Sequence, residues 1–462
     1  MYEVNFNNPV PVYFIGIGGC SMSGLAELLL SRGFSVSGSD KNHSTVCDRL
    51  EDMGISVFYG QRAENITPDL KFVVYTAAIH KDNPELTAAE KLGIPCINRA
   101  DFLGQLMRQY KDAIGVAGTH GKTTVSSMLS MIFLEAGLDP TISLGAVLDP
   151  IASSARAGHS DHFIVESCEY TNSFLHFYPR HEIILNIEAE HLDFFKDLED
   201  IRHSFRLFME KLSAGGHLVI QGDIAGLDEL TNGLSADITT YGLEGSGKTY
   251  DYYAANITYD TNDCGSYDLM HGETLIARIS LQVIGAHNIS NSVAAAAMAN
   301  LLGVPVPAIV SALHNFIGAK RRFEKKGLKN GVTIVDDYAH HPSEIRATLT
   351  AAKHYPHKTL WCVFQPHTFS RTKIFFDDFV DVLSLADKVV LADIYASREQ
   401  DPGDISSRDL AEKLQNAGKE VYYLPSFDEI EKFLLSNCTE GDLLITMGAG
   451  DIANVGEAIL KH

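Results

Sequence analysis

The sequence has few of the features that mark secreted or membrane proteins. Its seven cysteines are scattered over 462 residues, and none forms a C-x-x-C pair. No apolar run reaches the roughly 20 residues that cross a bilayer. Residues 1–10 show no basic stretch followed by an apolar one, so no signal peptide is visible. These absences argue against a disulfide framework and a structural zinc site, and we expect a cytoplasmic protein with reduced thiols.

Positive charge is also scarce. The chain has 37 Lys and Arg against 59 Asp and Glu, a net charge of −22. So acidic a chain is a poor non-specific binder of phosphate backbones, and we expect neither a nucleic-acid nor a membrane partner. Small anionic substrates are not excluded, because a few Lys, Arg and Mg²⁺ charges in one cleft can override the global sign. We therefore expect small-molecule partners and a monomer or homodimer.

The stretch from residue 113 to 124 carries the clearest chemical signal. An apolar run ends in glycine, and helical spacing of apolar residues follows from Val125 to Phe133. This order is typical of a phosphate loop, in which Lys122 neutralises phosphate and Thr123 offers a hydroxyl to Mg²⁺. Val116 replaces the first glycine of the pattern G-x-x-x-x-G-K-[ST], so an ordinary strand–helix connection is the alternative.

Residues 242–249 match the same pattern at every position, yet we expect a surface loop there. The following residues, 250–257, are rich in β-formers and lack helical spacing. A phosphate loop needs a strand before it and a helix after it. Context therefore favours the stretch around Lys122 over the one around Lys248.

The first hundred residues alternate strand and helix patterns, which predicts a parallel α/β sheet. Strands are expected at 12–19, 34–40, 72–76 and 94–97, and helices at 21–30, 84–92 and 101–110. The first strand ends in Gly16-x-Gly18-x-x-Ser21, which lacks the third glycine of an NAD fingerprint. The second ends at Asp40, where a dinucleotide fold binds a ribose hydroxyl. We favour an anion site for a nucleotide diphosphate, with an NAD-dependent oxidoreductase as the rival.

Two strands after the phosphate loop end on polar side chains. Residues 163–165 lead to Glu166, and residues 182–187 lead to a segment that contains His191. Ligands bind beyond the carboxyl ends of parallel strands, so both side chains are expected near the phosphate loop. Glu166 suits Mg²⁺, whereas His191 is less expected because Mg²⁺ prefers oxygen.

A helix is predicted at 292–302, and polar residues precede it. Asn288 and Asn291 lie three residues apart and so share one helical face. One of them could cap the helix; the alternative is a hydrogen-bonding site for a purine base.

The last stretch again alternates strands and helices, with strands at 332–335, 361–364, 388–392, 420–424 and 442–447. The first of these runs into four polar residues before a proline-started helix: Asp336, Asp337, His340 and His341. Burying four polar groups without a function would be costly, so this is a strong site signal. Further on, His367 and Arg371 are one helical turn apart if helical, and an arginine fork suits a substrate carboxylate.

Across nearly its whole length the sequence resembles the three-domain Mur ligases, which build the peptide stem of peptidoglycan. Seven ordered motifs carry the resemblance: Gly16–Gly24, Gly118–Thr124, Asn186–Asp193, His287–Asn291, Arg321–Phe323, Asp336–Pro342 and Gln365–Thr372. Residues 166–170 depart from many relatives, reading Glu-Ser-Cys-Glu-Tyr in place of Glu-Ala-Asp-Glu-Ser. Within the family, the match is to the branch that adds L-alanine to UDP-N-acetylmuramate.

The resemblance implies a fold and a reaction. The expected α/β domains are a Rossmann-like UDP-binding domain at 1–110, a P-loop ATPase-type domain with a mostly parallel sheet at 111–319, and a Rossmann-like domain at 320–462. The implied reaction joins the lactyl carboxylate of UDP-N-acetylmuramate to L-alanine through an acyl phosphate, with ATP as substrate and Mg²⁺ as metal. The domains are expected to close around the substrates, with hinges near Tyr110 and Ala319.

The resemblance also implies roles for single residues. Implied catalytic residues are Lys122, Glu166, His191, Arg322 and Asp337. ATP contacts are implied for Gly118, Thr119, His120, Gly121, Lys122, Thr123, Thr124, His287, Asn288, Asn291, Arg322 and Asp337. The UDP-sugar site falls on Gly18, Gly19, Met22, Ser23, Asp40 and Thr76. The amino-acid site falls on His340, His341, His367 and Arg371, and the Mg²⁺ ligands would be Thr123, Glu166 and His191.

Four alternatives stay open at this point. The nearest is a murein-recycling ligase that adds a peptide to the same nucleotide sugar, although the Gly18–Gly24 sequence favours the alanine branch. A folylpolyglutamate-synthetase-like enzyme would share the last two domains but would have no use for the first. The NAD-dependent oxidoreductase rests on Gly16-x-Gly18 alone. A non-catalytic nucleotide-binding module would not need the acidic and basic residues of the later motifs.

Overall fold

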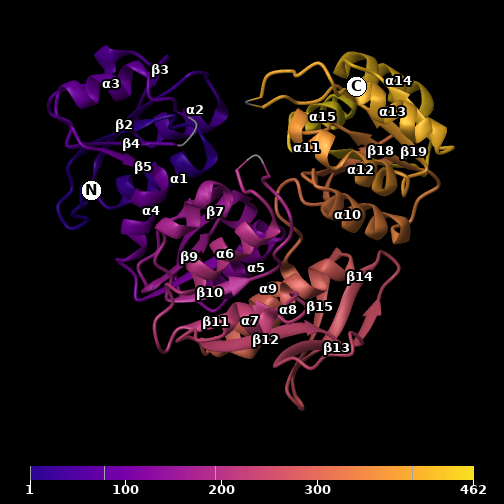
Figure 1. Ribbon diagram of the computed structural model, residues 1–462, viewed down its shortest axis with the longest axis horizontal. Coiled ribbons are helices and arrows are strands. Elements are labelled where there is room, and N and C mark those ends of the chain that lie inside the picture. Colours follow the sequence, from indigo (N-terminus) through magenta and orange to yellow (C-terminus); the bar gives the residue numbers. More distant parts are fainter. Residues whose placement is uncertain (1, 77–78, 193, 398) are drawn as a thin grey trace.

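The structure, a computed structural model, describes residues 2–76, 79–192, 194–397 and 399–462. It contains three sheets, which define an N-terminal, a middle and a C-terminal unit. Figure 1 shows the indigo N-terminal unit and the orange and yellow C-terminal unit, both beside the middle unit in magenta and pink. The predicted α/β fold of three domains is confirmed. Asp193, the last residue of the third family motif, lies outside the described residues.

The N-terminal unit is a five-stranded parallel sheet in the order β3-β2-β1-β4-β5. Its strands are β1 (Pro11–Ile15), β2 (Ser35–Asp40), β3 (Ser56–Tyr59), β4 (Phe72–Tyr75) and β5 (Cys96–Asn98). Its helices are α1 (Cys20–Ser31), α2 (Thr45–Asp52), α3 (Pro84–Lys91) and α4 (Arg99–Met107). Of these strands and helices, α2 and β3 have no predicted counterpart. The short edge strand β3 is largely exposed and so lacks the apolar run that marks a buried strand.

The middle unit has a ten-stranded sheet in the order β15-β14-β13-β12-β11-β10-β6-β9-β7-β8. Its strands are β6 (Asp112–Ala117), β7 (Thr141–Leu148), β8 (Ser153–Arg156), β9 (His162–Glu166), β10 (His181–Ile184), β11 (His217–Gln221), β12 (Asp237–Leu243), β13 (Tyr252–Tyr259), β14 (Cys264–His271) and β15 (Thr274–Ile284). Its helices are α5 (Lys122–Glu135), α6 (Leu198–Met209), α7 (Leu227–Thr231), α8 (Ala286–Leu301) and α9 (Val306–Asn315). The sheet is parallel from β7 to β13 and antiparallel at both edges, which confirms a mostly parallel sheet.

Two expectations about the middle unit have different outcomes. Residues 242 and 243 end β12, and the exposed residues 244–249 lead toward β13 without a helix, so the predicted surface loop is confirmed for 244–249. The helix predicted at 292–302 instead begins at Ala286, because its first turns are polar and hide the start of the apolar spacing. Its N-cap is Gly285, and the Asn288 amide donates to the Ile284 carbonyl at 2.8 Å. The capping role considered for Asn288 is therefore wrong.

The C-terminal unit is a six-stranded sheet in the order β16-β17-β21-β18-β19-β20, parallel except for β16. Its strands are β16 (Glu324–Lys329), β17 (Val332–Asp337), β18 (Leu360–Phe364), β19 (Lys388–Leu391), β20 (Glu420–Tyr423) and β21 (Leu443–Met447). Its helices are α10 (Pro342–His354), α11 (Phe369–Ile374), α12 (Phe376–Leu383), α13 (Ser407–Asn416), α14 (Phe427–Asn437) and α15 (Ala453–Lys461). The strands expected in this stretch are confirmed, and α10 begins at the predicted proline.

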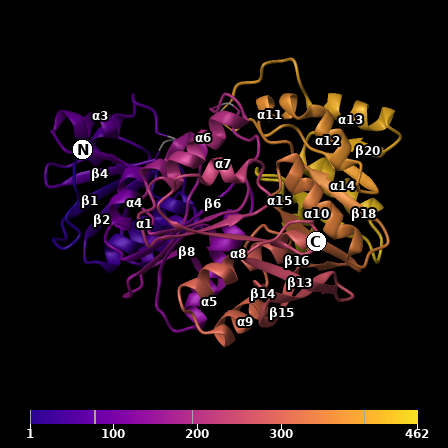
Figure 2. The same cartoon turned by 60° about the horizontal axis from the view of Figure 1, so that its bottom comes forward.

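The units are joined in different ways. One hydrophobic cluster continues from α4 of the N-terminal unit to α6 and one face of the middle sheet. Helices α5, α8 and α9 cover the other face (Figure 2). The clusters of the C-terminal unit contain only residues of that unit. Apolar packing therefore ties the first two units together, while the third meets the middle unit through the polar residues of the site.

Candidate active site

The loop between β6 and α5 has the backbone of an anion-binding turn. Gly118 and Gly121 have φ angles of 149° and 84°, which residues with a Cβ rarely adopt. A Cβ on Gly118 would also lie 2.8 Å from the Cβ of Leu185 on the neighbouring chain segment. The turn thus brings the N–H groups at the start of α5 to the edge of a cavity, where they can bind phosphate.

Lys122, the first residue of α5, curls back over this turn. Its Nζ lies 2.6 Å from the Gly118 carbonyl, 3.0 Å from the Thr119 carbonyl and 2.9 Å from Glu169 Oε2. Burial alone would lower the pKa of Lys122, but the Glu169 carboxylate outweighs it and raises the pKa above its usual value. The loop therefore holds a fixed positive charge.

Thr123 and Glu166 form a pair of oxygen ligands. The Thr123 hydroxyl donates to Glu166 Oε1 at 3.0 Å, and the Gly145 N–H donates to Oε2 at 2.8 Å. A hydroxyl and a carboxylate side by side fit Mg²⁺, which prefers oxygen. His191 lines the same cavity, but its Nε2 is 3.7 Å from Glu169, a different carboxylate. The fit to Mg²⁺ thus rests on Thr123 and Glu166.

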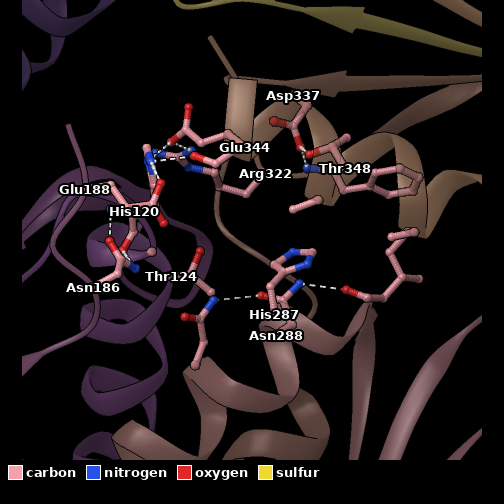
Figure 3. A pocket seen from close by; sticks show the side chains of 17 residues that line it. His120, Thr124, Asn186, Glu188, His287, Asn288, Arg322, Asp337, Glu344 and Thr348 are labelled. Atoms are coloured by element: carbon pink, nitrogen blue, oxygen red, sulfur yellow. Dashed lines mark hydrogen bonds and ion pairs between the residues drawn. The ribbon is translucent and has the colours of Figure 1, made fainter. Parts of the chain in front are cut away.

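A cavity of about 230 Å³ lies between the middle and C-terminal units (Figure 3). The middle unit lines it with residues of the phosphate loop and the start of α8, and the C-terminal unit with residues around β17 and α10. Of the residues expected to contact ATP, those lining this cavity are His120, Gly121, Thr124, His287, Asn288, Asn291, Arg322 and Asp337. Thr119, Lys122 and Thr123 line a second cavity, which shares four lining residues with the first: His120, Gly121, Arg322 and Glu344.

His120 links the phosphate loop to the C-terminal unit, as Figure 3 shows. Its Nδ1 lies 3.1 Å from Glu344 Oε1, and its Nε2 lies 2.8 Å from Ser343 Oγ and 3.4 Å from Glu188 Oε2. Burial lowers the pKa of His120, but Glu344 and Glu188 outweigh it and raise the pKa to about 9. A positive imidazole is thus held between two carboxylates at neutral pH.

Asp337 and Arg322 lie on the C-terminal side of this cavity. The Asp337 carboxylate accepts the backbone N–H groups of Phe323 at 2.8 Å and Ala339 at 2.7 Å. Burial raises the pKa of Asp337 to about 6, although Arg322 opposes the change. The Arg322 guanidinium lies 5.3 Å above the Tyr338 ring. Asp337 therefore ties the residue that follows Arg322 to the turn that follows β17.

The second cavity, of about 520 Å³, brings the phosphate loop and the C-terminal unit together. It is lined by Lys122 and by three of the four residues that the resemblance implies for the amino-acid site, His340, His367 and Arg371. His341 is not among its lining residues. It is the N-cap of α10, only 6% exposed, and its Nδ1 meets Ser343 at 2.7 Å.

The residues expected to bind UDP gather at the carboxyl edge of the N-terminal sheet. Asp40 Oδ2 accepts the Gly18 N–H at 3.0 Å, so the ends of β1 and β2 are joined there. Met22 and Ser23 are buried in α1, and the Ser23 hydroxyl donates to the Cys20 carbonyl at 3.0 Å.

Several residues of these sites have no predicted role. A cavity of about 360 Å³ at the edge of the N-terminal sheet is lined by Lys41, Gln61 and His80, among others. The rule that ligands bind beyond strand ends could have found these three. Glu190 and Glu344 also lack a predicted role. Glu344 stands three residues after His341, the spacing of a capping box, which is the signal for it.

Family models match all three units of the chain. The model described as Mur ligase family, catalytic domain, covers residues 11–111, the Mur ligase middle domain covers 116–299, and the Mur ligase, glutamate ligase domain, covers 321–450. The chain belongs to the Mur ligase family. The first of these models covers the N-terminal sheet, and the other two cover the phosphate loop and the residues around Arg322 and Arg371.

Individual Mur ligases are similar over nearly the full length. The UDP-N-acetylmuramate–L-alanine ligase of Lachnoclostridium phytofermentans is 58% identical, with 100% of both chains covered. A crystal structure of the UDP-N-acetylmuramate-alanine ligase of Thermotoga maritima matches with a TM-score of 0.83 at 27% identity, over 98% of each chain. A murein peptide ligase of Psychrobacter arcticus matches with a TM-score of 0.73 at 25% identity, over the same share.

Within the described residues, no helix is both long and apolar enough to cross a membrane.

Proposed function

We propose that this Mur ligase joins the lactyl carboxylate of UDP-N-acetylmuramate to L-alanine in the cytoplasm and converts ATP to ADP and phosphate. This proposal rests chiefly on the cavity of about 520 Å³, which the phosphate loop of the middle unit lines together with His340, His367 and Arg371 of the C-terminal unit. Such a cavity lets a phosphorylated carboxylate and an amine meet. The 58% identity to a ligase of this name supports the choice of substrates.

A carboxylate is a poor electrophile and must be activated first. In the proposed reaction, a carboxylate oxygen attacks the γ-phosphorus of ATP, the bond to the β-phosphate bridging oxygen breaks, and ADP leaves. Lys122 on one side and Arg322 on the other spread the charge on the transferred group. Bound Mg²⁺ would be held by Thr123 and Glu166, with His191 at the cavity wall, and would supply further positive charge.

The neutral amine of L-alanine then attacks the acyl phosphate carbon, the bond from that carbon to the phosphate oxygen breaks, and the phosphate leaves as hydrogen phosphate with the proton that the amine loses. His340 is suited to contact that amine. Its Nδ1 lies 3.0 Å from the Tyr338 carbonyl, which only accepts, so Nδ1 carries the proton and Nε2 holds a lone pair. Burial lowers the pKa of His340 to about 4, although Glu344 acts in the opposite direction, so the ring is neutral. Arg371 and His367 then receive the alanine carboxylate.

The proposal is tested by measuring ADP release with Mg²⁺, ATP and UDP-N-acetylmuramate. The acceptors are L-alanine, glycine, L-serine, L-glutamate and a muramyl-type peptide. We expect release that depends on both the nucleotide sugar and L-alanine. Lys122→Ala should lower it by roughly 100-fold or more, because one preorganised charge at the transition state is lost.

Lys248→Ala is the matched control, since Lys248 occupies the same place in the loop at residues 242–249 and should leave the rate unchanged. If ADP is released with the muramyl-type peptide and with no other acceptor, the chain belongs to the peptide-adding branch of the family. Folded protein that releases no ADP with any acceptor would contradict the ligase assignment.

A further inference from the structure

Glu190 of the middle unit and Arg371 of the C-terminal unit form a buried ion pair beside the larger cavity. Glu190 Oε1 accepts Arg371 Nε at 3.0 Å and Nη2 at 2.6 Å. Glu190 is 4% exposed, and the Arg371 side chain is 10% exposed. The pair connects the segment after β10 with α11, which lie 181 residues apart in sequence.

The remaining nitrogen of the Arg371 guanidinium, Nη1, contacts His367 of the C-terminal unit. Nη1 donates to His367 Nδ1 at 2.9 Å and to the His367 carbonyl at 3.2 Å. A guanidinium presents its N–H groups in one rigid plane, so fixing one edge fixes where the others point. Glu190 and His367 hold it from two sides, and only His367 belongs to the same unit.

The second carboxylate oxygen of Glu190 has a different environment. Oε2 is buried without a hydrogen-bond partner among the described residues, and it lies 3.6 Å from His341 Nε2. The nearest charged group to this carboxylate is the Arg371 guanidinium, whose Nη2 lies 2.6 Å from Oε1. The buried negative charge is thus offset chiefly by Arg371.

We propose that Glu190 is a positioning residue for the amino-acid site, whose carboxylate orients the Arg371 guanidinium toward the alanine carboxylate. This inference rests on the proposed function. The site for the second substrate is then complete only when the middle and C-terminal units are together. Glu190 does not contact alanine itself.

The test compares steady-state constants for L-alanine in wild type and Glu190→Ala. We expect KM for L-alanine to rise by roughly tenfold or more, with kcat reduced less, because a mobile arginine binds the carboxylate poorly. KM for ATP should change by no more than about twofold. Glu190→Asp should recover part of the loss. Glu210→Ala, which removes a similar but exposed pair with Arg206 on α6 (2.8 Å), should match wild type.

A double-mutant cycle with Arg371→Ala separates positioning from general structural damage. If Glu190 acts through Arg371, Glu190→Ala should change KM for L-alanine little in the Arg371→Ala background. If the two substitutions instead raise KM for L-alanine independently, so that their effects multiply in the double variant, the proposal is wrong. A lower KM in Glu190→Ala would also overturn it, because it would mean that Glu190 competes with the substrate for Arg371. Wild-type protein without alanine-dependent ADP release would contradict the proposed function instead.

Discussion

Glu182 is a buried carboxyl group in the core of the middle unit. It lies on β10, is fully buried, and neither carboxylate oxygen has a hydrogen-bond partner among the described residues. Burial raises its pKa well above the usual value, against the opposing effect of Lys211. The group is therefore protonated in the folded protein over a pH range in which it is ionised in the unfolded chain.

The sign of its effect on stability follows from the raised pKa. Below about pH 4.5 both states are protonated and Glu182 has no effect; above it, stability falls as pH rises toward the folded-state pKa. We expect Glu182→Gln to unfold roughly 2–4 °C higher than wild type at pH 7.5. The difference should vanish near pH 4 in scanning calorimetry. Glu229→Gln, at an exposed site on α7, should show no pH-dependent difference; equal curves for Glu182→Gln and wild type at pH 7.5 would contradict the prediction.

Site residues that belong to a local sequence motif were predictable from sequence, whereas residues whose role depends on a distant partner were not. Lys122, Glu166 and His340 follow strands in recognisable motifs, and the structure places all three at the larger cavity. Glu190 stands in a quoted motif too, but its partner Arg371 is 181 residues away. No local pattern encodes such a pair, because only the packing of two sheets brings it together.

Helix α10 of the C-terminal unit contacts the phosphate loop through side chains of its first turn. Its N-cap is His341, its first turn carries Ser343 and Glu344, and both of the latter contact His120. Because His120 has its pKa raised to about 9, this contact is strongest when the imidazole is charged. Its stabilising effect is fully present below pH 6.5 and is lost as pH rises through about 9.

His120→Asn should therefore destabilise the protein in a pH-dependent way. We expect a loss of about 3 kcal/mol below pH 6.5, shrinking toward zero above pH 9. The only tryptophan, Trp361, is buried on β18 of the C-terminal unit, so its fluorescence reports unfolding of that unit. His203→Asn, at an exposed site of α6, is the control. A loss for His120→Asn that stays constant from pH 6 to pH 10 would count against this role.

Element boundaries were predictable where burial creates a clear apolar pattern. Strands β4 and β18 are continuous apolar runs and β21 is apolar except for Thr446, and the positions of all three agree with prediction within two residues. The start of α8 was misplaced because polar residues that line a cavity occupy its first turns. The order of the strands, with β21 inserted between β17 and β18, is set by long-range pairing that local patterns do not contain.

At the scale of the whole molecule, the units differ in how freely they can move. The joint near Tyr110 is packed: its hydroxyl accepts from Arg32 Nη2 at 2.6 Å and donates to Thr141 Oγ1 at 2.9 Å, and its ring lies 4.7 Å from that of Phe163. A Cβ on Gly104 would lie 1.9 Å from the His176 carbonyl, so α4 is pressed against the middle unit. Of the two hinges expected from sequence, the structure favours the one near Ala319.

The linker between α9 and β16 carries the signs of such a hinge. Ile317 is 74% exposed, and Gly318 has a φ of 108°, outside the range that other residues favour. If the C-terminal unit rotates here during turnover, a Cβ at this position will restrict the rotation and cost about 1–2 kcal/mol of strain. We expect Gly318→Ala to lower kcat several-fold and to reduce the change in small-angle scattering when an ATP analogue, Mg²⁺ and UDP-N-acetylmuramate bind.

A comparison with Gly303→Ala, just after α8, distinguishes the effect of backbone strain from that of hinge motion. Gly303 also has a positive φ, 76°, and its Cβ position is open, but it lies outside the linker. Gly303→Ala should therefore lower the melting temperature about as much as Gly318→Ala while leaving kcat and the scattering change at wild-type values. If both variants lose kcat equally, the loss comes from strain in the backbone, and closure does not proceed through this linker. If only Gly318→Ala loses kcat, the glycine is required because the C-terminal unit must move to bring His340 and Arg371 to the phosphate loop.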